Sequence, residues 1–87
     1  MPERSITSEQ VRAARALLRW EQKDLSREAG VSHATIRRLE TIPGPLAAHK
    51  GTVEKIRDAF ARGGVIFIEE NGGGAGLRYT LPRQPPP

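Results

Sequence analysis

The stretch from Gln22 to Glu40 decides how this chain folds, and it reads Q-K-D-L-S-R-E-A-G-V-S-H-A-T-I-R-R-L-E. Gly30, near its middle, suits a turn between two short helices, because glycine adopts positive φ without a Cβ penalty. Ser32 can cap the second helix, which we expect from about Ser32 to Thr41. The apolar residues recur at helical spacing and should face inward: Leu25, Ala29, Val31, Ile36 and Leu39.

The outer side of this second helix is small and basic. The residues expected there are His33, Ala34, Thr35, Arg37 and Arg38. Two short helices in this layout form a helix-turn-helix, a motif that lays its second helix in the major groove of DNA. Arg37 and Arg38 are suited to guanine edges or to phosphates. A basic helix face is also common as a plain solvated surface, so the joint spacing of the whole stretch carries more weight than the arginines alone.

The stretch also follows a known pattern, Q-x-x-L-A-x-x-x-G-V-S-x-x-T-I-x-x-L-E, with Ser26 in place of its alanine. In these residues the chain resembles the phage-repressor and Cro-like (XRE) helix-turn-helix family. The resemblance extends from about Val11 through the fourth expected helix. It implies a four-helix repressor-like domain and a sequence-specific DNA-binding protein, in most members a dimeric repressor.

Carried over residue by residue, the resemblance implies a DNA-binding surface. It makes His33, Ala34, Arg37 and Arg38 the base-facing positions. It implies that Gln22 clamps a phosphate, with Ser32, Thr35 and Thr41 as further backbone candidates. It also implies a structural ion pair between Arg15 and Glu40. Two positions depart from the family: Glu21 stands where a Ser, Thr or Asn cap is usual, and Arg19 where a turn glycine is common.

In the segment before the motif, the sequence predicts one helix from Ser8 to Leu18. Thr7 and Gln10 have the spacing of a capping box. An inward stripe is formed by Val11, Ala14, Leu17 and Leu18. Trp20 should pack between the first two helices, with stacking on a nucleic-acid base as the alternative. Residues 1–6 are expected to be a frayed polar arm.

The segment after the motif predicts a loop and a fourth helix. Pro43 and Pro45 should end the second motif helix. His49 and Lys50, in the loop from Ile42 to Gly51, either contact phosphate or are simply solvated. The fourth helix is expected from about Thr52, as its cap, to Ala61. Its inward face is formed by Val53, Ile56, Ala59 and Phe60.

The C-terminal part has strand character. Val65–Ile68 is apolar and rich in β-branched residues, and Leu77–Leu81 alternates, which together predict a β-hairpin with a glycine-rich loop. Val65–Ile68 is apolar on both faces, so we expect it to join two copies in a homodimer. The alternative is a hairpin that folds wholly onto its own domain. The expected organisation is a helix-turn-helix domain at 1–62, the hairpin at 63–82 and a disordered tail at 83–87.

Composition narrows the function classes. The chain has 87 residues, no cysteine and a net charge of +4, which suits one small domain with an anionic partner. His33 and His49 lack the spacing of metal ligands, so we expect neither metal nor cofactor. We expect no membrane span, because no apolar run approaches ~20 residues, and therefore a cytoplasmic protein. The sequence contains neither an acid–base pair nor an activated nucleophile, so we do not expect an enzyme.

The sequence therefore predicts a mainly α fold, with a four-helix repressor-like helix-turn-helix domain and a C-terminal β-hairpin. The expected function is a transcriptional regulator that binds double-stranded DNA. The alternatives are an antitoxin-type autoregulator, which would add a protein partner, and a protein-interaction module on the same fold.

Overall fold

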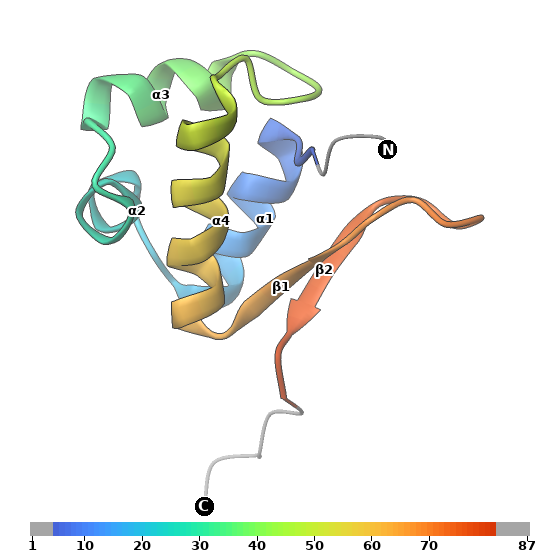
Figure 1. The fold of residues 1–87 in the computed structure, drawn as a ribbon. Helices are drawn as coiled ribbons and strands as arrows, with labels where there is room; N and C mark the ends of the chain where they lie inside the picture. The colour runs from blue at the N-terminus through green and yellow to red at the C-terminus, as the bar shows by residue number, and fades with distance from the viewer. Residues whose placement is uncertain (1–4, 82–87) are drawn as a thin grey trace, which may run out of the picture.

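The computed structural model describes residues 5–81 and contains four helices followed by a two-stranded antiparallel hairpin (Figure 1). The elements are α1 (Ser8–Leu18), α2 (Gln22–Ala29), α3 (His33–Thr41), α4 (Lys50–Gly63), β1 (Val65–Ile68) and β2 (Gly76–Tyr79). The expected mainly α fold with a C-terminal β-hairpin is confirmed. In the described part of the chain, no helix is long and apolar enough to cross a membrane.

One end of each of the first three helices lies at a capping signal in the sequence. At the start of α1, the Gln10 amide N–H donates to Thr7 Oγ1 at 3.1 Å, and the Thr7 N–H donates to Gln10 Oε1 at 2.9 Å. Gly30 closes α2 with φ of 68°, which glycine adopts without strain. Ser32 Oγ accepts from the Thr35 N–H at 3.1 Å and so caps α3. The capping signals seen in the sequence therefore set these boundaries.

The predicted start of α4 was wrong. The helix begins at Lys50, with His49 as the N-cap residue, and Thr52 lies inside its first turn. The Val53 N–H already bonds to the His49 carbonyl at 3.1 Å, so the helical ladder includes Gly51. His49 and Lys50 therefore belong to the start of a helix and not to the middle of a loop. Gly64, with φ of 100°, ends the helix after Gly63.

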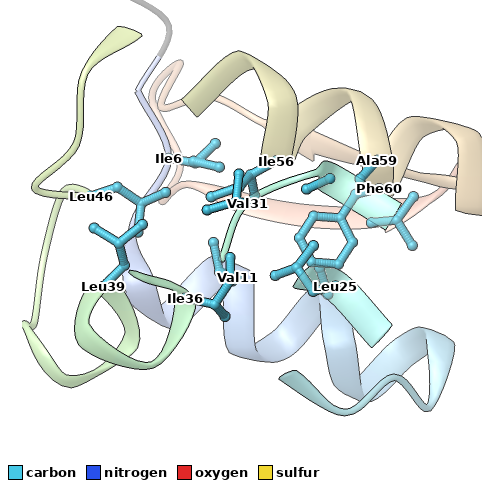
Figure 2. Packing of buried hydrophobic residues seen from close by; sticks show 13 residues of the cluster. Ile6, Val11, Leu25, Val31, Ile36, Leu39, Leu46, Ile56, Ala59 and Phe60 are labelled. Atoms are coloured by element: carbon cyan, nitrogen blue, oxygen red, sulfur yellow. The ribbon is translucent and has the colours of Figure 1, made fainter. Parts of the chain in front are cut away.

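A single core joins all four helices (Figure 2). Every inward residue predicted for the motif is buried, while Leu17, Leu18 and Val53 are only partly buried. Ile6 is 1% exposed and belongs to this core, so its assignment to a frayed arm was wrong. The Leu46 N–H donates to the Ile6 carbonyl at 3.0 Å, which ties the loop before α4 to the chain before α1. Residues 1–4 of the expected arm lie outside the described residues.

The hairpin packs on α1 and α4, whereas α3 packs on α1 and α2 (Figure 1). Val65 pairs with Tyr79 and Phe67 with Leu77, and all four contact the core. β2 ends at Tyr79, earlier than the predicted Leu81. The Thr80 N–H donates to the Gly64 carbonyl at 2.8 Å, one residue beyond the Val65–Tyr79 pair. The hairpin thus leaves the exposed side of α3 uncovered. The expected tail at 83–87 lies outside the described residues.

Candidate nucleic-acid interface

The exposed side of α3 carries the four residues assigned to base reading. Helical periodicity places Ile36, Leu39 and Glu40 on the buried side, where each is at most 4% exposed. The opposite side is formed by His33, Ala34, Arg37 and Arg38, all of them exposed. One short helix therefore presents a methyl group, an imidazole and two guanidinium groups on a single surface.

The two arginines of α3 have no ion-pair partner in the described part of the chain. Arg12, Arg15 and Arg27 each pair with a carboxylate, at 3.9 Å, 2.6 Å and 3.4 Å. Within residues 5–81, neither Arg37 nor Arg38 has a carboxylate oxygen within 4.0 Å. Both guanidinium groups keep their donors and their charge for an external anion.

A buried ion pair fixes α3 against α1. Arg15 Nε donates to Glu40 Oε2 at 2.7 Å, and Arg15 Nη2 donates to Glu40 Oε1 at 2.6 Å. Arg15 Nη1 also donates to the Trp20 carbonyl at 3.0 Å. The Glu40 side chain is 3% exposed, so this bidentate pair has the geometry that a buried carboxylate needs. The expected pairing of Arg15 with Glu40 is present.

The same carboxylate holds Gln22 at the start of α2. Gln22 Nε2 donates to Glu40 Oε1 at 3.2 Å, so part of the amide expected to clamp a phosphate already has a partner inside the protein. The primary amide has a second N–H, which remains for another acceptor. Sequence spacing could not reveal this bond, because it joins the start of one helix to the end of the next.

The turn between α2 and α3 is held by one further side chain. Ser26 Oγ donates to the Val31 carbonyl at 2.6 Å, a bond that the alanine of the family pattern could not make. Ser26 is only partly buried and Val31 is 9% exposed. The departure from the pattern therefore adds a hydrogen bond across the turn.

Trp20 is part of the protein interior and is not presented for base stacking. Its ring stacks on Phe60 of α4, with ring centroids 5.5 Å apart and an angle of 21° between planes. Trp20 packs on the core as expected, but its ring partner comes from α4, whereas the sequence had placed the ring between the first two helices.

The residues predicted to contact the DNA backbone differ in how many of their hydrogen-bonding groups are already used within the protein. The Ser32 hydroxyl donates to Thr35 Oγ1 at 2.8 Å, and the Thr41 hydroxyl donates to the Arg38 carbonyl at 2.7 Å. Each would have to exchange that bond for one to phosphate. His49 and Lys50 are exposed at the start of α4.

One hollow lies on each side of α3. One, of about 410 Å³, adjoins the start of α2 and is lined by Arg15, Trp20, Glu21, Gln22, Lys23 and His33. The other, of about 510 Å³, adjoins the start of α4 and is lined by Thr35, Arg38, Ala47, Ala48, His49 and Thr52. Of the predicted base-facing and backbone residues, Gln22 and His33 line the first hollow, and Thr35, Arg38 and His49 line the second.

The two helix starts beside these hollows differ in charge. At α2, the Glu21 N–H donates to Asp24 Oδ2 at 2.8 Å, and Lys23 pairs with Glu21 at 3.7 Å. At α4, the first turn has no acidic residue and His49 makes no side-chain capping bond. Because helix N-termini attract anions, the start of α4 is the more favourable of the two for a phosphate. Glu21, the residue that departs from the family pattern, makes the start of α2 more acidic.

Comparison with protein-family models and with curated proteins finds no match for this chain. The resemblance to the repressor family therefore stays a prediction that rests on the motif residues. Among residues 5–81, no three His, Cys, Asp or Glu side chains are grouped as they would be around a metal ion.

Proposed function

We propose that this protein is a sequence-specific DNA-binding transcriptional regulator that reads a half-site with α3. The observation that carries the proposal is the exposed surface of α3, where Arg37 and Arg38 have no carboxylate partner in the described part of the chain. The buried Arg15–Glu40 pair supports it, because a reading helix must be held in a fixed orientation.

The size of α3 suits the major groove. An α-helix with its side chains is about 10–12 Å across, which fits a major groove about 12 Å wide, and the nine residues of α3 extend roughly 13 Å along it at ~1.5 Å per residue. Arg37 and Arg38 have the donor fork that pairs with the O6 and N7 atoms of guanine, and each such pair discriminates by about 1–3 kcal/mol. The methyl group of Ala34 suits a thymine methyl, and His33 suits a base edge at the start of the helix.

The DNA backbone would run across the two hollows. Gln22 lines the hollow on the α2 side, and Thr35 and His49 line the one on the α4 side. Ser32 and Thr41 lie at the two ends of α3, and Lys50 begins α4. Contacts of this kind position the protein without reading sequence. A regulator that acts on DNA in this way would work in the cytoplasm.

The proposed regulator is a homodimer that represses from an inverted repeat. Ile66 and Ile68 are partly buried and are not among the residues that pack on the core, so this side of Val65–Ile68 is the part proposed to meet a second copy. A two-fold dimer would place its half-sites about 34–36 Å apart or at a multiple of that. Light scattering at micromolar concentration, with and without DNA, tests this. A particle that stays monomeric on DNA rules out the dimer.

Selection of binding sites from a random DNA library tests the function. Arg37→Ala/Arg38→Ala is the test variant, and Lys55→Ala/Arg62→Ala removes two exposed cations of α4 as a charge-matched control. We expect wild type and control to enrich an inverted repeat that the test variant does not. A single unrepeated half-site would keep DNA reading and reject the symmetric dimer. No enrichment at low salt would reject the DNA-binding proposal.

A second candidate function is a protein-interaction module on the same fold. The acidic start of α2, with Glu21 and Asp24, favours it because these carboxylates repel phosphate. The salt dependence of DNA binding separates the candidates. A DNA reader with several phosphate contacts loses affinity steeply between about 50 and 200 mM salt as counterions are released. An antitoxin-type autoregulator would show this salt dependence and would in addition bind a second protein.

A further inference from the structure

Arg15 has donor groups that its ion pair does not use. A guanidinium carries five N–H groups. The bonds to Glu40 and to the Trp20 carbonyl occupy one N–H on each of Nε, Nη1 and Nη2. One N–H on Nη1 and one on Nη2 therefore have no partner among residues 5–81. The Arg15 side chain is 19% exposed, whereas that of Glu40 is 3% exposed, so only the cation of the pair reaches the surface.

This exposed edge of Arg15 faces the proposed DNA-binding side. Arg15 lines the hollow of about 410 Å³ between the starts of α2 and α3, together with Gln22, Lys23 and His33. Gln22 contributes its second amide N–H there, because the first is bonded to Glu40. The hollow thus collects cationic and N–H donor groups from three helices beside the base-facing side of α3.

We propose that Arg15 binds a phosphodiester oxygen of the DNA backbone in this hollow, in addition to pairing with Glu40. The inference rests on the proposed function and extends it to a residue assigned only a structural role. Glu40 and the Trp20 carbonyl hold the guanidinium in place, so little side-chain freedom is lost when an anion binds. Arginine suits this task, because its fork holds one anion along its side and presents further N–H groups to another.

Glu21 is the opposing charge in the same hollow. Its carboxylate pairs with Lys23 at 3.7 Å, and both side chains are 68% exposed. An exposed pair of this kind is weak and can separate. An incoming phosphate would attract Lys23 and displace the carboxylate toward solvent, and Arg15 would remain as the fixed donor.

The test must separate a direct contact from a change of charge. Arg15→Gln alone leaves Glu40 as an unpaired buried anion, which would weaken DNA binding without any lost contact. The double variant Arg15→Gln/Glu40→Gln removes both charges and keeps the net charge of +4. Binding of the selected DNA site is measured against salt for wild type and the double variant, below the melting temperature of both. Arg37→Gln is the control for a base contact.

If Arg15 binds phosphate, the slope of log affinity against log salt falls by about 0.9 in the double variant, and the selected sequence stays the same. Arg37→Gln should instead change the preference at one base pair. A double variant with wild-type affinity and slope overturns the inference while DNA reading stands. A wild-type protein that binds no DNA overturns both proposals.

If the double variant does not fold, a measurement on the unmodified protein tests the same contact. The guanidinium signals of Arg15 are followed by ¹⁵N NMR as the selected DNA is added. A contact predicts shifted and slower-exchanging Nη signals for Arg15. Signals that stay unchanged while those of Arg37 shift would overturn the inference.

Discussion

The guanidinium of Arg15 in α1 holds the carboxylate of Glu40, the residue before the last one of α3, through two hydrogen bonds of 2.7 and 2.6 Å. Gln22, the first residue of α2, donates to the same carboxylate at 3.2 Å. One buried anion therefore joins α1 to the two helices of the motif, α2 and α3. The orientation of α3 depends on this junction as well as on apolar packing.

Replacing Arg15 with alanine should destabilise the fold strongly. The change leaves the 3%-exposed carboxylate of Glu40 without its cation, and removing one partner of a buried pair costs ~3–5 kcal/mol. Arg27→Ala is the matched control, since Arg27 pairs with Asp24 at 3.4 Å and its side chain is 67% exposed, and a surface pair of this kind is worth under ~1 kcal/mol. Urea unfolding of both variants measures the difference. Equal losses would show that the buried pair does not hold α3.

The motif could be predicted from sequence because its signals are local. Gly30, Ser32 and the apolar spacing act within a few residues of one another, and the resulting boundaries agree with the structure. Ile6 and Leu46 were missed as core residues because each is buried only through pairing with a segment far away in the chain. The start of α4 was misplaced because Thr52 is a good capping residue and Gly51 a poor helix former, yet the helix includes both.

The candidate site also has features that local sequence predicts and features that it does not. Helical periodicity identifies which side chains of α3 point outward, so the exposure of Arg37 and Arg38 could be predicted. The bond from Gln22 to Glu40 and the hollow beside Arg15 could not, because they depend on how three helices meet. The repressor resemblance implied the Arg15–Glu40 pair, but only the distances reveal the donors that Arg15 has left.

Gly63→Ala should lower stability, because α4 passes close to the end of α1 at this residue. A Cβ at Gly63 would lie 2.8 Å from Leu18 Cδ1 and 3.0 Å from Trp20 Cζ2. The Leu18 methyl can rotate away, but the Trp20 ring is held by its stacking on Phe60. Overpacking of this kind costs about 1–3 kcal/mol, against a gain of up to ~1 kcal/mol in helix propensity.

Gly51→Ala in the same helix is the matched control for Gly63→Ala. A Cβ at Gly51 would meet no atom within 4 Å, so stability should rise by up to ~1 kcal/mol. Thermal melts of the two variants should shift in opposite directions. A rise in both would mean that Trp20 moves aside easily.

Arg19→Gly should stabilise the protein slightly. Among the described residues, Arg19 is the only non-glycine residue with positive φ, at 56°, and it occupies the place where the family usually has a glycine. This conformation destabilises the fold by about 1–2 kcal/mol for an L-residue, and glycine removes that strain. Glycine also makes the unfolded chain more flexible, which destabilises the fold by ~0.4–1 kcal/mol. We expect a net gain of about 1 kcal/mol or less in urea unfolding. A loss would mean that the exposed arginine side chain makes a stabilising contribution of its own.

Glu9 should make the stability of the protein depend on pH, through its contact with Gly44 in the loop before α4. A hydrogen bond from its own backbone N–H, followed by one from the Gly44 N–H at 3.1 Å, lowers the pKa of the Glu9 carboxyl below its usual value of 4.5. Because the folded pKa is the lower one, the carboxylate stabilises the fold above the unfolded pKa. This contribution disappears as pH falls through the folded pKa. Melting temperatures of wild type and Glu9→Gln should therefore differ at pH 7 and converge as the pH falls below 4.5 and through the folded pKa. A difference that stays constant down to strong acid would assign the effect to the shape of the side chain and not to its charge.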